Sequence, residues 1–421
     1  MRINFVWRAA AWILLAGFQS TVLADDGAYC DLSACDDGCD SACFDRHGSI
    51  CDLMCLGDSG GWELSGWLDS GIIGNTSSPA SKFNGPYNAV DRSNELMMNQ
   101  LYLVAEKSLP GCGHGIGGRV DYLYGEDFFL AESIGIEKRT DGSPHWNNEY
   151  YGSAFPQAFV SLGSQKLNVQ VGHFYSIVGY EGVMAPDNFF YSKSYSYQFA
   201  GPFTHWGGQV NWAASDALTF QAGLHNGWDA FDRVSDKVGF IGKVRYDSHA
   251  TGSWTSFAIT TGEESNNGSG LALNPGFTNR TRYSWLVGLP LTCRLDYVFH
   301  HWLGFQEGGA ADGARADWYG IDQYLTYAIN RCTKVGVRFE WFRDEEGTRV
   351  GLNRTSNPNI PALAGDYYSL SVGVNYTPSH HLTLRPEIRA DWYDGDAAPL
   401  PFNDGNDSEQ LMIGIDAILR I

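Results

Sequence analysis

The sequence lacks, after its first two dozen residues, any apolar run long enough to cross a bilayer as a helix, which needs about 20 residues. Each later apolar stretch is interrupted by a charged residue, a glycine or an asparagine within a few positions. Basic residues are scarce, with 28 Lys and Arg against 48 Asp and Glu and a net charge of −20. This deficit excludes nucleic acid as an expected partner, because its binders need clustered positive charge. A C-x-x-C-H haem motif is absent too, and we predict no cofactor and no metal centre.

The N-terminus has the three-part layout of a secretory signal. Arg2 and Arg8 bracket a basic region, residues 9–18 are apolar, and residues 22–24 are small or branched. This pattern predicts a signal peptide over residues 1–24, and the alternative is a buried N-terminal helix. An exported chain without membrane-spanning helices is either a soluble periplasmic protein or a β-barrel, because only helices and closed barrels satisfy their backbone in lipid.

Alternation at period two, the signature of a strand with one buried face, recurs along the chain. The clearest case runs over residues 382–392, where Leu384 and Ile388 alternate with Arg389 and Asp391. Aromatic residues make up 14% of the chain, which suits barrel strands that are apolar on one face only. Two groups near the predicted strand ends suggest two interfacial aromatic belts: Trp228, Trp302, Trp341, Phe342, Trp392 and Tyr393 in one, and Trp212, Tyr327 and Tyr376 in the other.

Strand spacing gives the fold class. We predict an all-β, transmembrane, antiparallel up-and-down β-barrel of about 16 strands over residues 61–421. The count is given as 14–18 because strand boundaries are the least reliable feature of such a prediction. The connections alternate between short turns and long loops, which is the asymmetry of outer-membrane barrels. The predicted strands are 61–72, 95–107, 115–127, 153–163, 165–175, 203–213, 217–227, 237–247, 251–262, 281–289, 292–302, 315–329, 332–343, 366–377, 381–393 and 409–421.

Several long segments make the sequence familiar. The stretch 171–195, VGHFYSIVGYEGVMAPDNFFYSKSY, resembles the bacterial β-barrel porins of the OmpL-like group, as do NQLYLVAEK at 99–107, GPFTH at 201–205 and NGWD at 226–229. The likeness extends from about residue 60 to the C-terminus. It implies a barrel in the bacterial outer membrane, surrounded by lipid, that passes small solutes. By analogy with classical porins, a homo-trimer is a further expectation. The chain ends in Ile421, whereas many outer-membrane barrels end in Phe.

A cysteine-rich segment over residues 25–60 precedes the predicted barrel. Because disulfides are the default for dense cysteines after export, we predict that these residues are oxidised. Six cysteines allow fifteen pairings, among which the sequence cannot choose. A metal site is the alternative, disfavoured because paired C-x₂-C units are lacking. The six are Cys30, Cys35, Cys39, Cys43, Cys51 and Cys55, and three more, Cys112, Cys293 and Cys332, lie near strand ends.

Passive diffusion of small hydrophilic solutes is the predicted function, because a barrel of about sixteen strands encloses an aqueous channel. One alternative is a tether or adhesin that uses the cysteine-rich segment. Another is a membrane-embedded hydrolase, for which a nucleophile beside a base would be needed. The visible histidine candidates are the pairs 300–301 and 380–381, and neither is part of a recognisable serine motif.

The predicted constriction is the long loop 176–202, which is rich in aromatic residues and therefore expected to pack on a surface. If it folds into the lumen, its carboxylates would face a wall of basic side chains and the resulting field would tune ion choice. The candidate lining residues are Glu181 and Asp187 of the loop and Lys243, Arg245, Arg294, Arg338, Glu340, Arg385, Glu387, Arg389 and Asp391 of the strands.

Acidic residues accumulate in the predicted outer loops. Solvation is the simpler explanation, and Ca²⁺ bridging is the sharper one, because Ca²⁺ prefers carboxylate oxygens. The residues concerned are Glu263, Glu264, Asp344, Glu345, Glu346, Asp394, Asp396, Asp404 and Asp407.

Overall fold

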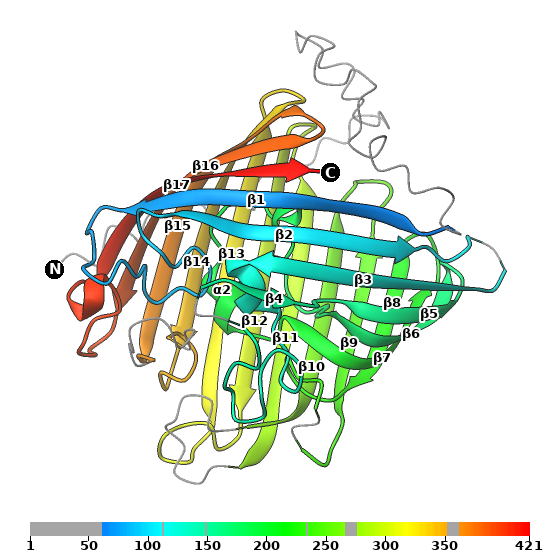
Figure 1. Ribbon diagram of the computed structural model, residues 1–421, viewed down its shortest axis with the longest axis horizontal. Coiled ribbons are helices and arrows are strands. Elements are labelled where there is room, and N and C mark those ends of the chain that lie inside the picture. The colour runs from blue at the N-terminus through cyan, green and yellow to red at the C-terminus, as the bar shows by residue number, and fades with distance from the viewer. Residues whose placement is uncertain (1–60, 112, 148–149, 233–234, 266–275, 352–361) are drawn as a thin grey trace. The chain divides into compact units, whose positions relative to one another are not determined.

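The computed structural model describes residues 61–111, 113–147, 150–232, 235–265, 276–351 and 362–421 (Figure 1). The described strands form one antiparallel sheet in which each pairs with its neighbours in the sequence. The first strand, β1 (Glu63–Asn75), pairs with both β2 (Leu96–Lys107) and the last strand, β17 (Glu409–Arg420), and this closes the barrel. No helix among the described residues has the length and apolar character needed to span a bilayer.

The other strands follow in chain order. They are β3 (Gly115–Gly125), β4 (Gly152–Ala154), β5 (Ala158–Gly163), β6 (Leu167–Tyr175), β7 (Thr204–Ala213), β8 (Leu218–His225), β9 (Gly239–Asp247), β10 (Trp254–Ser265), β11 (Phe277–Pro290), β12 (Leu295–Gln306), β13 (Ala316–Ala328), β14 (Thr333–Asp344), β15 (Gly365–Ser379) and β16 (Leu382–Asp394).

The fourth strand of the barrel is interrupted. Both β4 and β5 pair with β3, but Ala154 lies opposite Leu123 whereas Ala158 lies opposite Val120. Four steps along this strand therefore match three along β3, which is a bulge of one residue. Pro156 lies in the gap, and its missing N–H cannot join the ladder. Counted as one strand, β4 and β5 give a closed barrel of sixteen strands, so the predicted architecture is confirmed.

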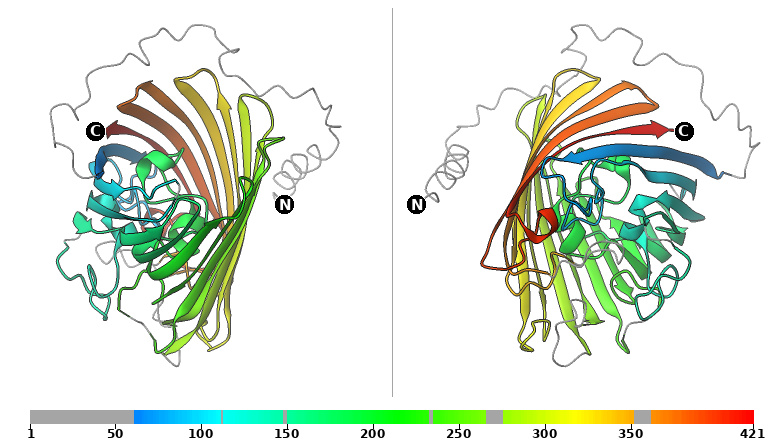
Figure 2. Two further views of the ribbon diagram at one scale, coloured as in Figure 1. Left: turned by 90° about the vertical axis from the view of Figure 1, so that its right-hand side faces the viewer. Right: turned by 60° about the vertical axis from the view of Figure 1, so that its left-hand side comes forward.

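The connections differ in length at the two ends of the barrel (Figure 2). One end carries short turns, and the other carries long connections, three of which contain the short helices η4 (Glu126–Ala131), η5 (Ala185–Asp187) with α2 (Tyr195–Phe199), and η6 (Asn403–Gly405). The short turns are 108–114, 164–166, 214–217, 248–253, 291–294, 329–332 and 380–381. This asymmetry matches the short periplasmic turns and long outer loops of outer-membrane barrels.

The two faces of the barrel differ in polarity. Outward side chains such as Val372, Ile388 and Ile413 are apolar and about half exposed (50%, 52% and 54%). Inward neighbours on the same strands, such as Arg389, are charged and buried. An apolar outer surface suits contact with lipid, and a polar interior suits a lumen.

One predicted aromatic belt is partly wrong. Trp302 and Phe342 point into the barrel and are fully buried, and Trp228 and Tyr393 belong to the same buried cluster. Because successive side chains of a strand face opposite sides, residues 341 and 342 cannot both meet lipid. Trp341 and Trp392 do face outward, where each packs on a tyrosine of the preceding strand. At the short-turn end, Trp212, Tyr327 and Tyr376 are exposed on the outer face.

Candidate functional site

The connection between β6 and β7, residues 176–203, lies inside the barrel, and we name it the β6–β7 segment. Figure 1 shows its helix α2 within the ring of strands. Trp318 on the inner face of β13 donates its indole N–H to Ala200 O at 2.9 Å. Arg349, in the connection after β14, donates its Nε to Phe199 O at 2.7 Å. Wall side chains thus satisfy the carbonyls that end the short helix, which holds it against the wall.

Glycines on the inner face leave room for the aromatic residues 189–191 of the β6–β7 segment. A Cβ added at Gly336 would lie 2.5 Å from the ring of Phe189, and one at Gly71 would lie 2.6 Å from the ring of Tyr191. Such distances are too short for real side chains. Small residues at these two places therefore allow the segment to approach the wall closely.

Arg385 of β16 holds the segment near η5. Its Nη1 donates to Ala185 O at 2.8 Å and to Asn188 O at 2.7 Å. Its Nε lies 3.0 Å from Asp416 Oδ1 on β17, and its Nη2 also contacts this carboxylate. Since the guanidinium is neutralised by Asp416 and its donors are used by carbonyls, its charge is compensated although it is buried.

Arg389, four residues after Arg385 on β16, also holds the segment. Its Nη1 donates to Lys193 O at 2.7 Å, and its Nε donates to Asp391 Oδ1 at 2.9 Å. The guanidinium lies over two rings, 4.6 Å from the centre of Tyr87 and 5.3 Å from that of Tyr195. This cation–π contact joins the connection after β1, the β6–β7 segment and the wall.

Arg338 of β14 makes the densest contact. Its Nη1 lies 2.7 Å from Glu181 Oε1 and 2.9 Å from Ser192 O, while its Nη2 donates to the hydroxyls of Ser192 and Ser371. Glu387 accepts from the backbone N–H of Ser192 at 2.8 Å. A carboxylate of the segment therefore meets a basic residue of the wall inside the barrel, in a buried ion pair.

Glu340 receives the first turn of α2. Its two oxygens accept the backbone N–H groups of Tyr195 and Ser196 at 2.8 and 2.6 Å, and Ser369 donates to one of them at 3.2 Å. Ser194 caps the helix by accepting from the N–H of Tyr197 at 3.1 Å. Free N–H groups at a helix start favour a carboxylate there, which explains a buried Glu at this position of the wall.

Lys193 and Glu181 of the segment carry shifted pKa values. Burial lowers the pKa of Lys193 to about 8, although carboxylates such as Asp127 and Glu181 act against the shift. Its Nζ donates to Gly182 O at 2.8 Å. Burial alone would raise the pKa of Glu181, but the charges of Arg338 and Lys193 prevail and lower it.

The inner wall opposite these anchors is polar and partly exposed. Asn211 donates to Asn168 at 2.9 Å and accepts from Gln221 at 2.8 Å, which links β6, β7 and β8. Lys243 on β9 continues this wall and has no ion pair within the described part of the chain. Arg245 on the same strand pairs with Asp247 at 2.7 Å. This wall, which carries amides and the cation of Lys243, is hydrophilic.

Two other candidate lining residues lie apart from the anchors. Arg294 lies in a short turn, just before β12, and its carbonyl accepts from Ala328 N at 2.8 Å. Asp187 is an exposed residue of η5, and partial burial still raises its pKa. The structure thus gathers Glu181, Arg338, Glu340, Arg385, Glu387, Arg389 and Asp391 where the segment meets the wall and leaves Lys243, Arg245 and Arg294 elsewhere, while Asp187 is an exposed residue of the segment itself.

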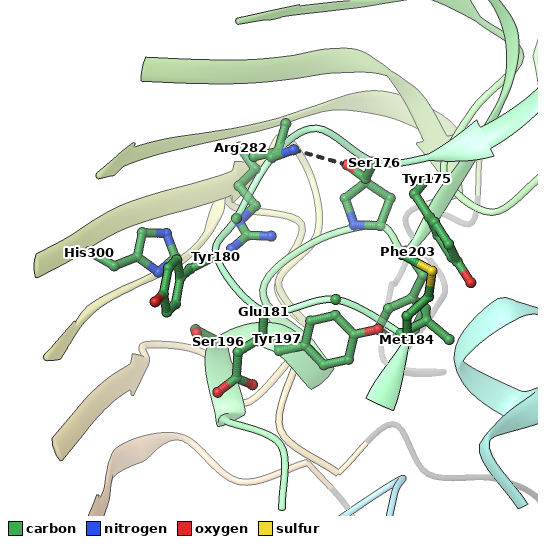
Figure 3. Close-up of a pocket in the computed structure, with 15 residues that line it drawn as sticks. Tyr175, Ser176, Tyr180, Glu181, Met184, Ser196, Tyr197, Phe203, Arg282 and His300 are labelled. Atoms are coloured by element: carbon green, nitrogen blue, oxygen red, sulfur yellow. Dashed lines mark hydrogen bonds between the residues drawn. The ribbon is translucent and has the colours of Figure 1, made fainter. Parts of the chain in front are cut away.

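A cavity of about 180 Å³ separates the segment from β11 and β12 (Figure 3). Arg282 and His300 enter it from the strands, facing Glu181 and Tyr197 of the segment. Arg282 is buried, and its Nε has no hydrogen-bond partner among the described residues. Arg282 was not among the predicted lining residues, although its alternation with the outward Tyr283 places it on the inner face.

His300 forms a chain of contacts that resembles a hydrolase triad. Its Nε2 lies 2.8 Å from Ser284 Oγ, and its Nδ1 lies 2.6 Å from Asp322 Oδ2, which also accepts from Ser196. Ser284, however, is 1% exposed and does not line the neighbouring cavity. Because a nucleophile must reach its substrate, we interpret the three residues as a buried hydrogen-bond network.

Two of the acidic residues proposed for the outer loops turn inward. Asp344 is buried and accepts the backbone N–H groups of Thr348, Arg349 and Val350, and Glu264 accepts from Trp228 N at 2.8 Å. Within the described ranges, no three His, Cys, Asp or Glu side chains are grouped to hold a metal ion. Calcium binding at the other acidic residues stays a prediction.

The predicted signal peptide and the six cysteines between residues 30 and 55 lie outside the described residues, as does Cys112. Cys293 and Cys332 are both disulfide-bonded and lie in neighbouring short turns. The oxidation expected for the N-terminal segment therefore stays a prediction, whereas two cysteines of the barrel are oxidised.

A closed antiparallel barrel with an apolar exterior, a polar interior and a long connection held inside is the architecture of porins. The chain belongs to the family described as "Putative beta-barrel porin-2, OmpL-like", whose model matches residues 61–421. No curated protein matches the chain.

Solved outer-membrane channels share the fold. The outer membrane channel DcaP of Acinetobacter baumannii is 12% identical, with a TM-score of 0.55 over 86% of this chain and 97% of that one. An anion-selective porin from Comamonas acidovorans is 11% identical, with a TM-score of 0.56 over 86% and 99%. OprB of Pseudomonas putida is 10% identical, with a TM-score of 0.54 over 89% and 96%. At such low identity the likeness concerns the fold.

Proposed function

We propose that the protein is a passive porin of the bacterial outer membrane, through which small hydrophilic solutes diffuse, and that the β6–β7 segment is its constriction. The observation that carries the proposal is the buried ion pair between Glu181 and Arg338, 2.7 Å long, which joins the segment to the wall inside the barrel. Three wall arginines satisfy carbonyls of this one segment. A connection held in this way narrows the lumen and leaves the polar wall of β6 to β9 for water and solutes.

The surroundings of the barrel follow from its outer face. Exposed apolar side chains of the strands contact lipid, with the short turns in the periplasm and the long loops outside. One neighbour of the same fold, OmpT of Vibrio cholerae, is described in a trimer form and has a TM-score of 0.51. We propose a homo-trimer here as well.

Planar-bilayer recording on purified, folded protein tests the proposal. We expect stable open channels, and swelling of liposomes in small sugars. Replacing Lys243 on the free inner wall by Glu should shift the reversal potential towards cations, because lumen charges tune selectivity. Lys166→Glu is the matched control, since Lys166 is exposed in the turn between β5 and β6. Protein with confirmed β-structure that gives neither conductance nor swelling would refute the porin function.

A further inference from the structure

A second cavity, of about 140 Å³, lies inside the barrel at the short-turn end. Its wall contains four basic residues and no carboxylate: Arg331 from the turn before β14, Lys334 from β14, Arg385 from β16 and Arg420 from β17. A basic lining of this kind is unexpected in a chain whose net charge is −20.

Three of these four charges are not neutralised locally. Arg385 is paired with Asp416, but Arg331, Lys334 and Arg420 form no ion pair with any described residue. Arg420 donates its Nη1 to Thr383 Oγ1 at 2.9 Å, which is a neutral partner. Arg331 and Lys334 are exposed and Arg420 is half-buried, so these charges are accessible to an ion that enters from the solvent.

Asp187 of the β6–β7 segment attracts Arg420 electrostatically, without forming an ion pair with it. It does not line the cavity, and its side chain is exposed. The negative charge of Asp187 balances at most that of Arg420. Arg331 and Lys334 are paired with no described carboxylate, so the cavity keeps an excess of positive charge.

The cavity depends on the β6–β7 segment for one of its walls. Pro186 and Asn188 of the segment line it, and the contacts of Arg385 with Ala185 O and Asn188 O hold this part in place. Thr383, two residues before Arg385 on β16, also lines the cavity, and its hydroxyl contacts Arg420 and the hydroxyl of Thr377. The site is therefore formed by the fixed connection, one turn and the four strands β14 to β17.

We propose that this cavity binds a small multivalent oxyanion of the phosphate class, and that the channel therefore favours anions despite the acidic chain. Three cations attract a dianion more strongly than they attract chloride, and charge-assisted hydrogen bonds to its oxygens add to the attraction. The cavity volume of about 140 Å³ is several times the roughly 30 Å³ that one water occupies in the liquid, so a small oxyanion fits. Because fields are screened beyond about 10 Å at 0.1 M salt, the cavity acts on ions that pass within that distance of it at the short-turn end of the barrel. This inference rests on the proposed porin function.

Single-channel recording in chloride with added inorganic phosphate is the test. We expect phosphate to reduce the current, and to do so more strongly from the compartment facing the short turns than from the other. Glycerol phosphate in a parallel arm distinguishes a phosphoryl group carried by a solute from free phosphate. In the triple variant Arg331→Gln/Lys334→Gln/Arg420→Gln, we expect block to weaken by at least about tenfold and the reversal potential to shift towards cations.

Single variants keep the test interpretable if the triple variant folds poorly. Lys334→Gln removes one charge from the cavity, and Lys166→Gln removes one from an exposed turn at the same end of the barrel. Block should weaken in Lys334→Gln and stay at the wild-type level in Lys166→Gln. A wild-type protein without conductance would contradict the porin function itself. A conducting channel that phosphate does not block, or that is blocked equally in both single variants, would overturn the anion site alone.

Discussion

Replacing Arg338 by Met should loosen the β6–β7 segment and widen the channel. The guanidinium is fully buried and gives four hydrogen bonds, three of them to the segment, at 2.7 to 3.1 Å. Removing one partner of a buried ion pair costs about 3–5 kcal/mol, because Glu181 is left buried without its counter-charge. A loss of about 4 kcal/mol raises the population of detached segment by about three orders of magnitude. Arg385 and Arg389 remain as anchors, so we expect transient release and not permanent loss.

Single-channel recording measures this effect directly. Arg338→Met should give a larger mean conductance, more current noise and passage of larger sugars than the wild type. The double variant Glu181→Gln/Arg338→Met should be milder, because neither charge is then left unpaired. Arg343→Met is the matched control: it lies on the same strand, faces outward and pairs with the partly exposed Glu345 and Asp366. Equal conductance and noise in Arg338→Met and Arg343→Met would refute the anchoring role.

Two further outcomes concern pH and thiols. Because burial lowers the pKa of Lys193 to about 8, its buried charge disfavours the packed segment below that pH, and the cost falls as pH rises from 8 towards the ordinary value of 10.5. Resistance of the segment to limited proteolysis should therefore increase from pH 7 to 9.5, and a Lys193→Met variant that shows the same increase would exclude this cause. For the thiols, mass spectrometry before and after reduction should find the six cysteines between residues 30 and 55 oxidised along with Cys293 and Cys332, and six unreacted native thiols in that segment would contradict the disulfide prediction.

The position of Arg338 in the structure changes which residue best tests ion selectivity. From the sequence, neutralising Arg338 and Arg389 should tune ion selectivity, because both belong to the inner face. In the structure both guanidiniums are fully buried beneath the β6–β7 segment. Their removal should therefore act first on the attachment of the segment, while Lys243, which remains on the open wall, is the better probe of selectivity.

The amino-acid sequence was enough to predict the barrel and the polarity of its two faces. Alternation at period two is a local property, so residues 382–392 reveal which side chains face inward without any knowledge of their partners. The same rule placed Glu340, Glu387 and Asp391 on the inner face, and the lengths of the connections distinguished the two ends. The same alternation places Arg282 on the inner face, although this residue was not predicted to line the lumen. It also shows that Phe342 cannot belong to the outer belt if its neighbour Trp341 faces outward.

How the interior of the barrel is filled depends on contacts between distant parts of the chain, which the sequence does not reveal. A backbone carbonyl has no residue signature, so the contacts of Arg385 with residues 185 and 188 could not be foreseen from side-chain types. The space that Gly336 leaves for Phe189 depends on two stretches of chain brought together from about 150 positions apart. The basic cavity at the short-turn end likewise joins side chains from a turn and four strands with part of the β6–β7 segment. These residues become neighbours when the barrel closes. Local alternation predicts which face of the sheet a side chain occupies, but it does not predict which other side chain it contacts.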